Sequence, residues 1–353
     1  MWNELALPHI FRIVTVCLDA TDTKSFLDLI SDKPMIGHAV RELALLSPDP
    51  EDDDTPFYLS TPIMHETMKM LVGKMSRLRV LYLISIYDTG EHSPPELFRN
   101  LSTFRNIERV EILGCRFPLS LLQAYVSAFP GLRSLVLNDS DEEEKDLLPF
   151  RSEVHPLSIE RLRIRCLPQP PPVLSWLASS NSKMTLKNLR LDVDIIPNSP
   201  IQDFLRQIGP SLVELDLKLP ELLPVPYNKS LDPEGEVNLK DATQLLSLTL
   251  RPAHSVYILN TLSTVAAPRL AQLKLTVLEY DSTIDEMYRK LALGIQSLQA
   301  LRFLEEIVFI YKGSMEYFEE AEAALKTIFV KAGVRCTVTV VHSSSLKRWW
   351  LSG

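Results

Sequence analysis

Apolar residues recur along the chain in a short, fixed pattern: an aliphatic residue, two variable residues, a second aliphatic residue, one variable residue and a third aliphatic or aromatic residue. The alternation in the second half of this phrase is typical of a β-strand with one buried face. The first residues of consecutive phrases lie 25 to 38 residues apart, with a mean of about 29. The ten copies are Val40–Leu45, Leu78–Leu83, Ile107–Ile112, Leu132–Leu137, Ile159–Ile164, Leu186–Leu191, Leu212–Leu217, Leu245–Leu250, Leu270–Leu275 and Leu304–Phe309.

Segments with helical spacing of apolar residues lie between the phrases. Strands that alternate with helices through short links predict an α/β chain with a parallel sheet. The repeat length is at the upper end of the leucine-rich-repeat range of about 20 to 29 residues. We therefore expect a leucine-rich-repeat solenoid, a curved horseshoe with the parallel sheet on its concave face and the helices on its convex face. The expected helices span residues 63–75, 95–104, 120–129, 173–178, 201–208, 256–262, 284–298 and 316–331.

The repeats predict one solenoid over residues 1–353, because each unit buries its apolar face only against its neighbours. Residues 1–39 form an N-terminal cap region, residues 40–310 hold the repeats, and residues 311–353 hold a C-terminal helix, a final strand and a tail. The expected cap elements are a strand over 12–17, a helix over about 24–30 and a strand over 334–341.

The C-terminal region offers two further predictions, one for its helix and one for its tail. The spacing of Tyr317, Ala321, Ala324 and Ile328 predicts the buried face of the helix there. The tail residues Trp349 and Trp350 either cover the last repeat or belong to a loose end.

Composition narrows the possible functions. The net charge is −8, which argues against general affinity for nucleic acids, since polyanion binding requires a broad cationic surface. The N-terminus lacks the pattern of a signal peptide, and no apolar run is long enough to cross a membrane. Four widely spaced cysteines show no CxxC pattern and predict reduced core thiols in a cytoplasmic or nuclear protein. They are Cys17, Cys115, Cys166 and Cys336.

Three further segments are interpreted as surface loops. Two acidic runs, residues 51–54 and 139–146, each follow a predicted strand and lack the glycine and ligand spacing of a calcium loop. Residues 220–235 are rich in proline and read as an insertion at the surface.

The phrases surrounding the repeats carry a family resemblance. The segments Pro8–Val16, Phe129–Leu137, Pro170–Leu177 and Phe204–Leu217 resemble the repeat region of fungal F-box proteins of the type common in mushroom-forming fungi. The resemblance covers most of the chain and consists of many weak matches. It implies that the repeats select the substrate of a cullin–RING ubiquitin ligase.

The F-box that such proteins carry near the N-terminus is not recognisable here. Leu7–Phe11 resembles its opening, but only about 30 residues separate this segment from the first repeat phrase, and the later helix with Cys and Trp is missing. We expect the chain to begin just after the F-box position. It would then be a truncated product, a product with a misassigned start, or a member that has lost docking to the ligase.

Catalytic and cofactor motifs are missing from the sequence. No GxSxG, HExxH, P-loop or GxGxxG pattern occurs, and the seven histidines do not pair with a cysteine or an acid at a recognisable spacing. We therefore expect no enzyme activity, no cofactor and no metal site.

The predicted concave face offers a basic patch. Side chains alternate along a strand, so the third and fifth residues of each phrase should point outward. The residue directly after the phrase, counted here as its seventh, should point to the same side. Arg161, Arg163 and Arg165 then share one strand, with Arg190 beside Arg163 and Arg109 in the same column as Arg161. An acidic or phosphorylated peptide would relieve the repulsion between these arginines. A ladder of ion pairs, Arg190 with Asp216 and Arg165 with Asp192, is the alternative.

A second patch on this face is apolar. Val80, Tyr82 and Ile84 lie on one predicted strand, with Leu46 and Leu113 on its neighbours. Grouped exposed apolar side chains indicate a partner contact or a loop that folds over the face.

The sequence thus predicts a non-enzymatic, monomeric protein-interaction module, similar to the substrate-recognition half of an F-box protein. Its partner would be a protein or peptide on the concave face, with a cullin-ligase adaptor only if an F-box lies upstream. The alternative is a free-standing repeat scaffold or regulator with no link to ubiquitin ligases.

Overall fold

The chain forms two compact units, Met1–Thr185 and Leu186–Gly353, in a computed structural model. The continuity of one solenoid over residues 1–353 stays a prediction. The structure describes residues 9–18, 20–47, 60–71, 73–86, 101–138, 158–165, 170–179, 185–192, 199–218, 237–251, 255–277, 284–298 and 301–346.

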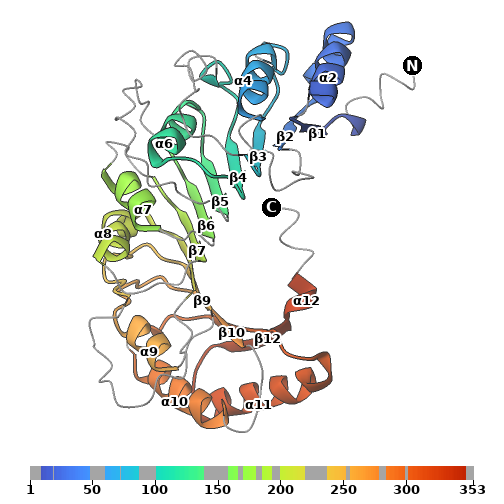
Figure 1. Ribbon diagram of the computed structural model, residues 1–353. Coiled ribbons are helices and arrows are strands. Elements are labelled where there is room, and N and C mark those ends of the chain that lie inside the picture. The colour runs from blue at the N-terminus through green and yellow to red at the C-terminus, as the bar shows by residue number, and fades with distance from the viewer. Residues whose placement is uncertain are drawn as a thin grey trace, which may run out of the picture. The chain divides into compact units, whose positions relative to one another are not determined.

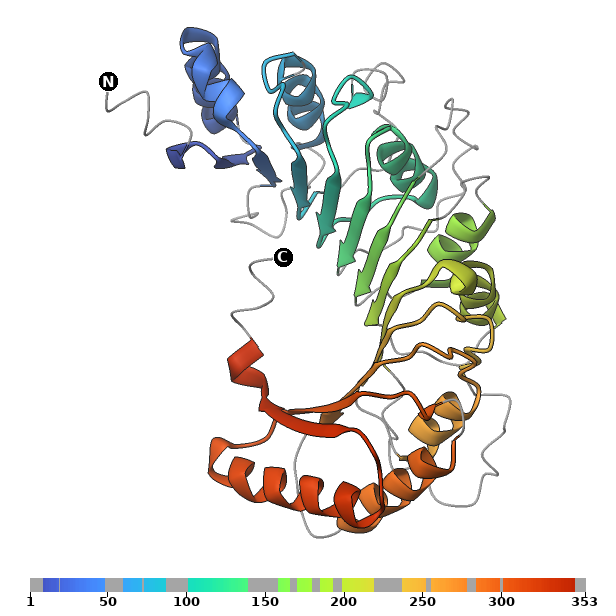
Figure 2. The same ribbon diagram turned by 180° about the vertical axis from the view of Figure 1, so that it is seen from behind.

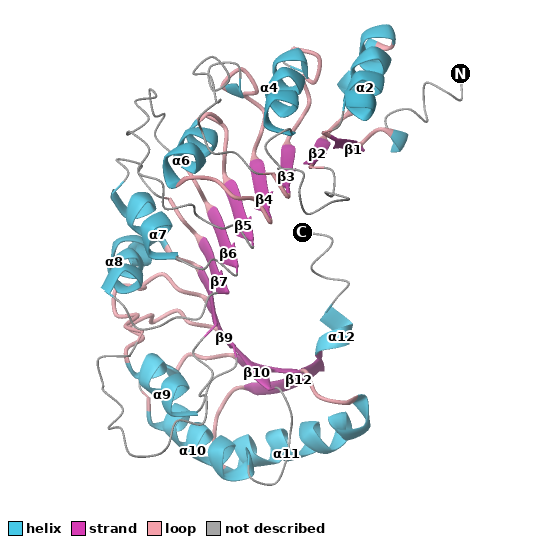
Figure 3. Cartoon of the chain, viewed as in Figure 1, coloured by secondary structure: helices cyan, strands magenta, loops and turns pink. Residues whose placement is uncertain are grey.

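The first unit contains six described strands that follow one another in chain order and pair in parallel (Figure 1). Its helices lie along one face of these strands (Figure 3). The strands are β1 (Ile13–Cys17), β2 (Glu42–Leu46), β3 (Val80–Ile84), β4 (Arg109–Leu113), β5 (Ser134–Asn138) and β6 (Arg161–Arg165). The helices are α2 (Ala20–Asp32), α3 (Pro34–Ala39), α4 (Ser60–Leu71), α6 (Leu119–Ser127) and α7 (Pro170–Ser179).

The second unit repeats this plan with six more described strands, again parallel and in chain order (Figure 2). The predicted α/β class with a parallel sheet is therefore confirmed. The strands are β7 (Asn188–Asp192), β8 (Glu214–Lys218), β9 (Ser247–Arg251), β10 (Gln272–Val277), β11 (Glu306–Tyr311) and β12 (Thr337–His342). The helical segments are α8 (Ser199–Ile208), η2 (Gly209–Ser211), α9 (Ser255–Ser263), α10 (Ile284–Ser297), η5 (Met315–Tyr317), α11 (Phe318–Lys331) and α12 (Ser343–Leu346).

The aliphatic positions of each phrase form the core of both units. On β3, Leu81 and Leu83 are buried, whereas the alternate residues Val80, Tyr82 and Ile84 are only half-buried. The same alternation recurs on β4 and on most strands of the second unit. Each buried leucine contributes about 1.5–3 kcal/mol of transfer free energy. Because neighbouring strands pair in register at these positions, the leucines form continuous rows beneath the sheet.

Glycine is required where the turn before a phrase approaches a neighbouring repeat. A Cβ on Gly131 would lie 2.6 Å from the carbonyl oxygen of Arg105. A Cβ on Gly209 would lie 2.8 Å from the carbonyl carbon of Asp241, in the turn before the following phrase. Both contacts are with backbone atoms, which cannot move aside as a flexible side chain can.

The helix predictions agree with the structure except at a few ends. Tyr317 was expected on the buried face of the C-terminal helix, but it lies in η5 and is 51% exposed. The buried face of α11 is instead Ala321, Leu325, Ile328 and Phe329. Short helices α3 and α12 were not predicted, because pieces of four to six residues carry too little periodicity to detect.

The final strand is displaced slightly from its prediction. It was expected over 334–341 and runs as β12 from Thr337 to His342, paired in parallel with β11. Several other predictions lie outside the described residues: most of the helix over 95–104, the acidic runs, the 220–235 insertion, Cys166 and both tail tryptophans.

Candidate interaction surface

The side of each sheet away from its helices carries the third, fifth and seventh residues of the phrases. We call this side the open face of each unit. Its rows follow from the strand register. In the first unit they are Glu42–Val80–Arg109–Ser134–Arg161, Ala44–Tyr82–Glu111–Val136–Arg163 and Leu46–Ile84–Leu113–Asn138–Arg165.

The predicted arginine trio lies on the open face of the first unit. Arg161 and Arg165 are exposed and Arg163 is half-buried, whereas Leu162 and Ile164 between them are buried. The alternation in the sequence Arg-Leu-Arg-Ile-Arg turns all three guanidinium groups toward the same side. The structure therefore brings these three predicted residues together.

Arg109 lies in the same row as Arg161, with Ser134 between them. Its Nη2 is 2.5 Å from Oε1 of Glu111 two residues along β4, and both side chains are partly shielded from solvent. The sequence analysis placed Arg109 with the basic patch, and the structure adds that a carboxylate neutralises part of its charge.

Arg190 belongs to the second unit, so its predicted place beside Arg163, like the pair of Arg165 with Asp192, stays a prediction. The predicted pair with Asp216 is confirmed: Arg190 Nε lies 3.4 Å from Asp216 Oδ2. Arg190 also approaches Asp192, at 3.6 Å from Nη2 to Oδ2.

The sequence analysis did not single out Arg251, which is the centre of this group. Its Nε donates to Asp216 Oδ1 at 2.6 Å and its Nη1 donates to Asp192 Oδ2 at 3.0 Å. Burial lowers the pKa of Arg251, but the two carboxylates outweigh it and raise the pKa overall. We call Arg190, Asp192, Asp216 and Arg251 the ionic cluster. The sequence signal for this cluster was the presence of acidic and basic residues at neighbouring positions of adjacent rows.

A chain of polar side chains continues on the same face toward the C-terminus. Gln272 Nε2 donates to Glu306 Oε2 at 2.7 Å, and Thr339 Oγ1 donates to the other oxygen of Glu306 at 2.9 Å. At the other end of the unit, Asn188 Nδ2 donates to Glu214 Oε2 at 2.6 Å. Much of the polar surface on the second unit's open face is thus engaged in contacts within the sheet.

The predicted apolar patch in the first unit is less accessible than expected. Val80, Tyr82 and Ile84 are each half-buried, and so are Leu46 and Leu113 on the neighbouring strands. Tyr82 donates its hydroxyl hydrogen to Glu42 Oε2 at 3.0 Å. Burial, followed by this hydrogen bond and the charges of Glu42 and Glu111, raises the pKa of Tyr82 to about 12.

The described cysteines lie in or beside strands, as predicted. Cys115, two residues after the end of β4, is fully buried: its Sγ donates to Leu83 O at 3.2 Å and accepts from Ile86 N at 3.4 Å. Burial raises its pKa to about 12. Cys17 and Cys336 are half-buried, and burial also raises the pKa of Cys336.

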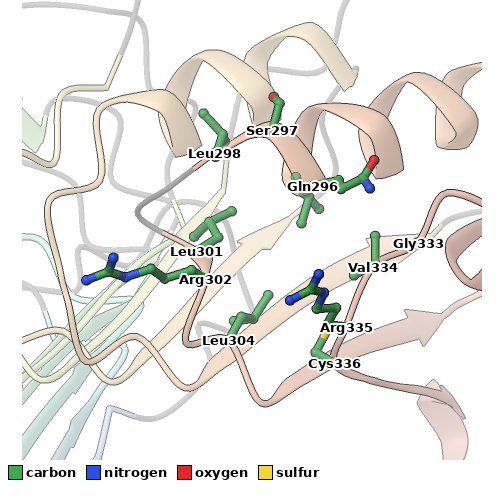
Figure 4. A pocket seen from close by; sticks show the side chains of 11 residues that line it. Gln296, Ser297, Leu298, Leu301, Arg302, Leu304, Gly333, Val334, Arg335 and Cys336 are labelled. Carbon is green, nitrogen blue, oxygen red and sulfur yellow. The ribbon is translucent and has the colours of Figure 1, made fainter.

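A pocket of about 470 Å³ lies in the second unit between the end of α10 and the turn before β12. Figure 4 shows Arg302 and Arg335 among the side chains that line this pocket, on the segments that lead to β11 and β12. Cys336 is also part of the lining. Its described lining residues include neither a carboxylate nor a histidine, so the pocket does not assemble a nucleophile with a base.

Two of the described histidines contact neutral groups. His38 Nδ1 lies 3.0 Å from Ser76 Oγ, and His342 Nε2 lies 3.0 Å from the carbonyl oxygen of Gly313. Within the described ranges, no group of three metal-ligating side chains converges. None of the helices seen there is both long and apolar enough to cross a membrane.

Two comparisons with known proteins identified no relative of this chain. No family model matches the chain, and a search of curated proteins found no match.

Proposed function

We propose that this chain is a non-enzymatic protein-interaction module, built as a leucine-rich-repeat solenoid, that holds a partner protein on the open face of its sheet. The ten repeat phrases, the parallel strands in chain order and the alternating burial support the repeat architecture. Consecutive repeats of this kind present one continuous surface of strand side chains, which suits an extended partner.

The observation that carries the proposal is the arginine trio on β6. Three guanidinium groups occupy alternate positions of a five-residue strand, and the outer two are exposed to solvent. Their forked donors match the oxygens of carboxylate and phosphate groups. The proposed partner segment is therefore acidic or phosphorylated.

The strands of the two units carry different charge patterns on their open faces. In the second unit, Arg190 and Arg251 hold Asp192 and Asp216 at short distances, so their charges are largely balanced within the sheet. On β6, the alternate positions carry only positive charge.

A charge-reversal variant tests this proposal. Replacing Arg161, Arg163 and Arg165 together with Glu should leave the fold intact, because Arg161 and Arg165 are exposed and Arg163 is only half-buried, and should abolish capture of the partner in affinity purification with mass spectrometry. A matched control replaces three exposed lysines on the helix side of the same unit, Lys24, Lys33 and Lys69, with Glu. If both variants recover the same proteins as the original chain, the open face of β6 is not the contact surface.

The family resemblance extends this proposal to substrate recognition in a cullin–RING ubiquitin ligase of the cytoplasm or nucleus. The alternative is a repeat scaffold with no ligase link. Co-purification of the full gene product with the cullin adaptor separates the two, because only a product with a functional F-box retains the adaptor.

A further inference from the structure

A second group of arginines lies at the amino-terminal edge of strands β1 to β3, away from the trio on β6. Arg12, Arg41 and Arg79 each occupy the position directly before a strand. Backbone hydrogen bonds fix them side by side: Arg41 N donates to Arg12 O at 2.9 Å, and Arg79 N donates to Arg41 O at 2.8 Å. Arg77, two residues before Arg79, joins them through its carbonyl oxygen, which accepts from Arg41 Nη1 at 3.5 Å. We call these four residues the edge arginines.

The edge arginines have no acidic partner among the described residues. None of the four comes within ion-pair distance of a carboxylate in the part of the chain that the structure describes. Arg12, Arg77 and Arg79 are exposed and Arg41 is half-buried between them. Burial lowers the pKa of Arg41, and the charges of Arg77, Arg79 and Arg12 lower it further. The charged neighbours that act on Arg41 are thus other arginines.

This arrangement is unusual for a chain with a net charge of −8. Like charges on adjacent strands destabilise a sheet, and here three consecutive strands carry them at the same register. The next three members of the same row are mixed in sign: Glu108, Arg133 and Glu160. Arg133 has an acidic neighbour, with Nη1 at 4.0 Å from Glu160 Oε1.

We propose that the edge arginines form a second docking site that binds a phosphorylated side chain of a partner protein. Neighbouring strands lie about 4.8 Å apart, so the three edge positions span only about 10 Å. A phosphate monoester carries nearly two negative charges and three acceptor oxygens, and several guanidinium forks can reach it over this distance.

The size and setting of the site favour this ligand over longer polyanions. A nucleic acid running along the edge would leave the arginines and meet Glu108 and Glu160, which repel it. The exposed edge also suits a phosphate presented by another protein better than a free small molecule, since small-molecule sites are usually enclosed clefts. This site uses different residues from the trio on β6 and does not depend on the function proposed for that strand.

The test uses an immobilised library of peptides, each with one central phosphothreonine or phosphoserine, and the same library after phosphatase treatment. The original chain should be retained by the phosphorylated library alone, and inorganic phosphate should compete. Introduced into the β6 triple variant, which removes the other proposed phosphate site, the double substitution Arg41→Gln with Arg79→Gln should lower retention at least about tenfold, because two charge-assisted hydrogen-bonding groups are removed.

Arg133→Gln is the matched control, since Arg133 occupies the same row but lies between Glu108 and Glu160. It should keep retention within about twofold. The triple variant of β6 should also retain the library, which separates this site from the one proposed above. Thermal unfolding of each variant shows whether it is folded.

Three results would overturn the proposal. One is equal retention by the phosphorylated and dephosphorylated libraries, or by neither. Another is equal loss in the Arg133→Gln control. A third is preferential binding of single-stranded RNA or of phosphatidylserine vesicles that depends on Arg41 and Arg79, which would assign the site to a different class of partner.

Discussion

Arg251 on β9 donates its Nε hydrogen to Asp216 on β8 at 2.6 Å, with the two side chains 11% and 17% exposed. The same guanidinium group holds Asp192 of β7 through Nη1 at 3.0 Å. One side chain therefore ties together three consecutive strands. Since these groups are mostly removed from water, breaking the contact leaves charges that solvent compensates poorly.

We expect Arg251→Met to lower the free energy of unfolding by about 3 kcal/mol, because two partly buried carboxylates lose their main counter-ion. Denaturant unfolding followed by circular dichroism measures the change. Arg206→Gln serves as the control: it breaks a 2.9 Å pair with Asp203 on α8, but both side chains are more than half exposed. That loss should be below about 0.5 kcal/mol. Equal effects of the two variants would show that the ionic cluster is no more stabilising than a surface pair.

Tyr82 should lose its hydroxyl proton only at an unusually high pH. Its pKa is raised to about 12 in the folded chain, against 10 for an ordinary tyrosine, so phenolate absorbance at 295 nm should show one tyrosine titrating about two pH units above an exposed one. Replacing Glu42 with Gln should lower this pKa, because the carboxylate that opposes the phenolate is removed while the burial remains. The variant Tyr82→Phe should lack this titration, which assigns the absorbance change to Tyr82.

The same shift makes stability depend on pH at the alkaline end. Below pH 10, Tyr82 is protonated in the folded and the unfolded chain, and its contribution is fully present. Between pH 10 and about 12, the unfolded chain loses the proton while the folded chain keeps it, so stability falls as the pH rises. The loss specific to this residue should be about 1–2 kcal/mol and should be missing in Tyr82→Phe. A loss of the same size in the variant would assign it to other groups.

Cys115 should resist thiol reagents in the folded chain. Its side chain is fully buried, and a pKa of about 12 leaves a thiolate fraction near pH 8 that is about 10³-fold lower than for an ordinary cysteine. Peptide mapping after treatment with iodoacetamide should find Cys115 unmodified while the half-buried Cys17 reacts. In urea, both should react at similar rates. Rapid labelling of Cys115 in the folded chain would mean that the end of β4 opens readily.

The repeat phrases were sufficient to predict the strands, their parallel order and their buried residues. The alternation of apolar and variable residues predicts which side chains of a strand such as β3 are buried in the core. The exposed arginines of β6 followed from the same rule. The rule works because leucine rows can be buried only on one side of the sheet.

The sequence was less informative about which polar residues meet. Arg251 reaches Asp192 across an intervening strand, which requires a long side chain to lie over the sheet, and no spacing rule predicts that orientation. The edge arginines were missed because they precede the strands, outside the alternation that the analysis followed. An arginine in the second position of the first two phrases, Arg41 and Arg79, was the available signal.

Gly131 offers a test of how closely successive repeats approach each other. A methyl group added there would lie 2.6 Å from the carbonyl oxygen of Arg105 and 3.2 Å from that of Ile107, so either the turn or the preceding repeat has to shift. We expect Gly131→Ala to lower the free energy of unfolding by about 1–3 kcal/mol, as overpacking against backbone does. Arg133→Ala, two residues later and exposed, should cost less than about 1 kcal/mol because it removes only a surface ion pair. If Gly131→Ala proved as stable as the original chain, the turn before β5 would have room that this geometry does not provide.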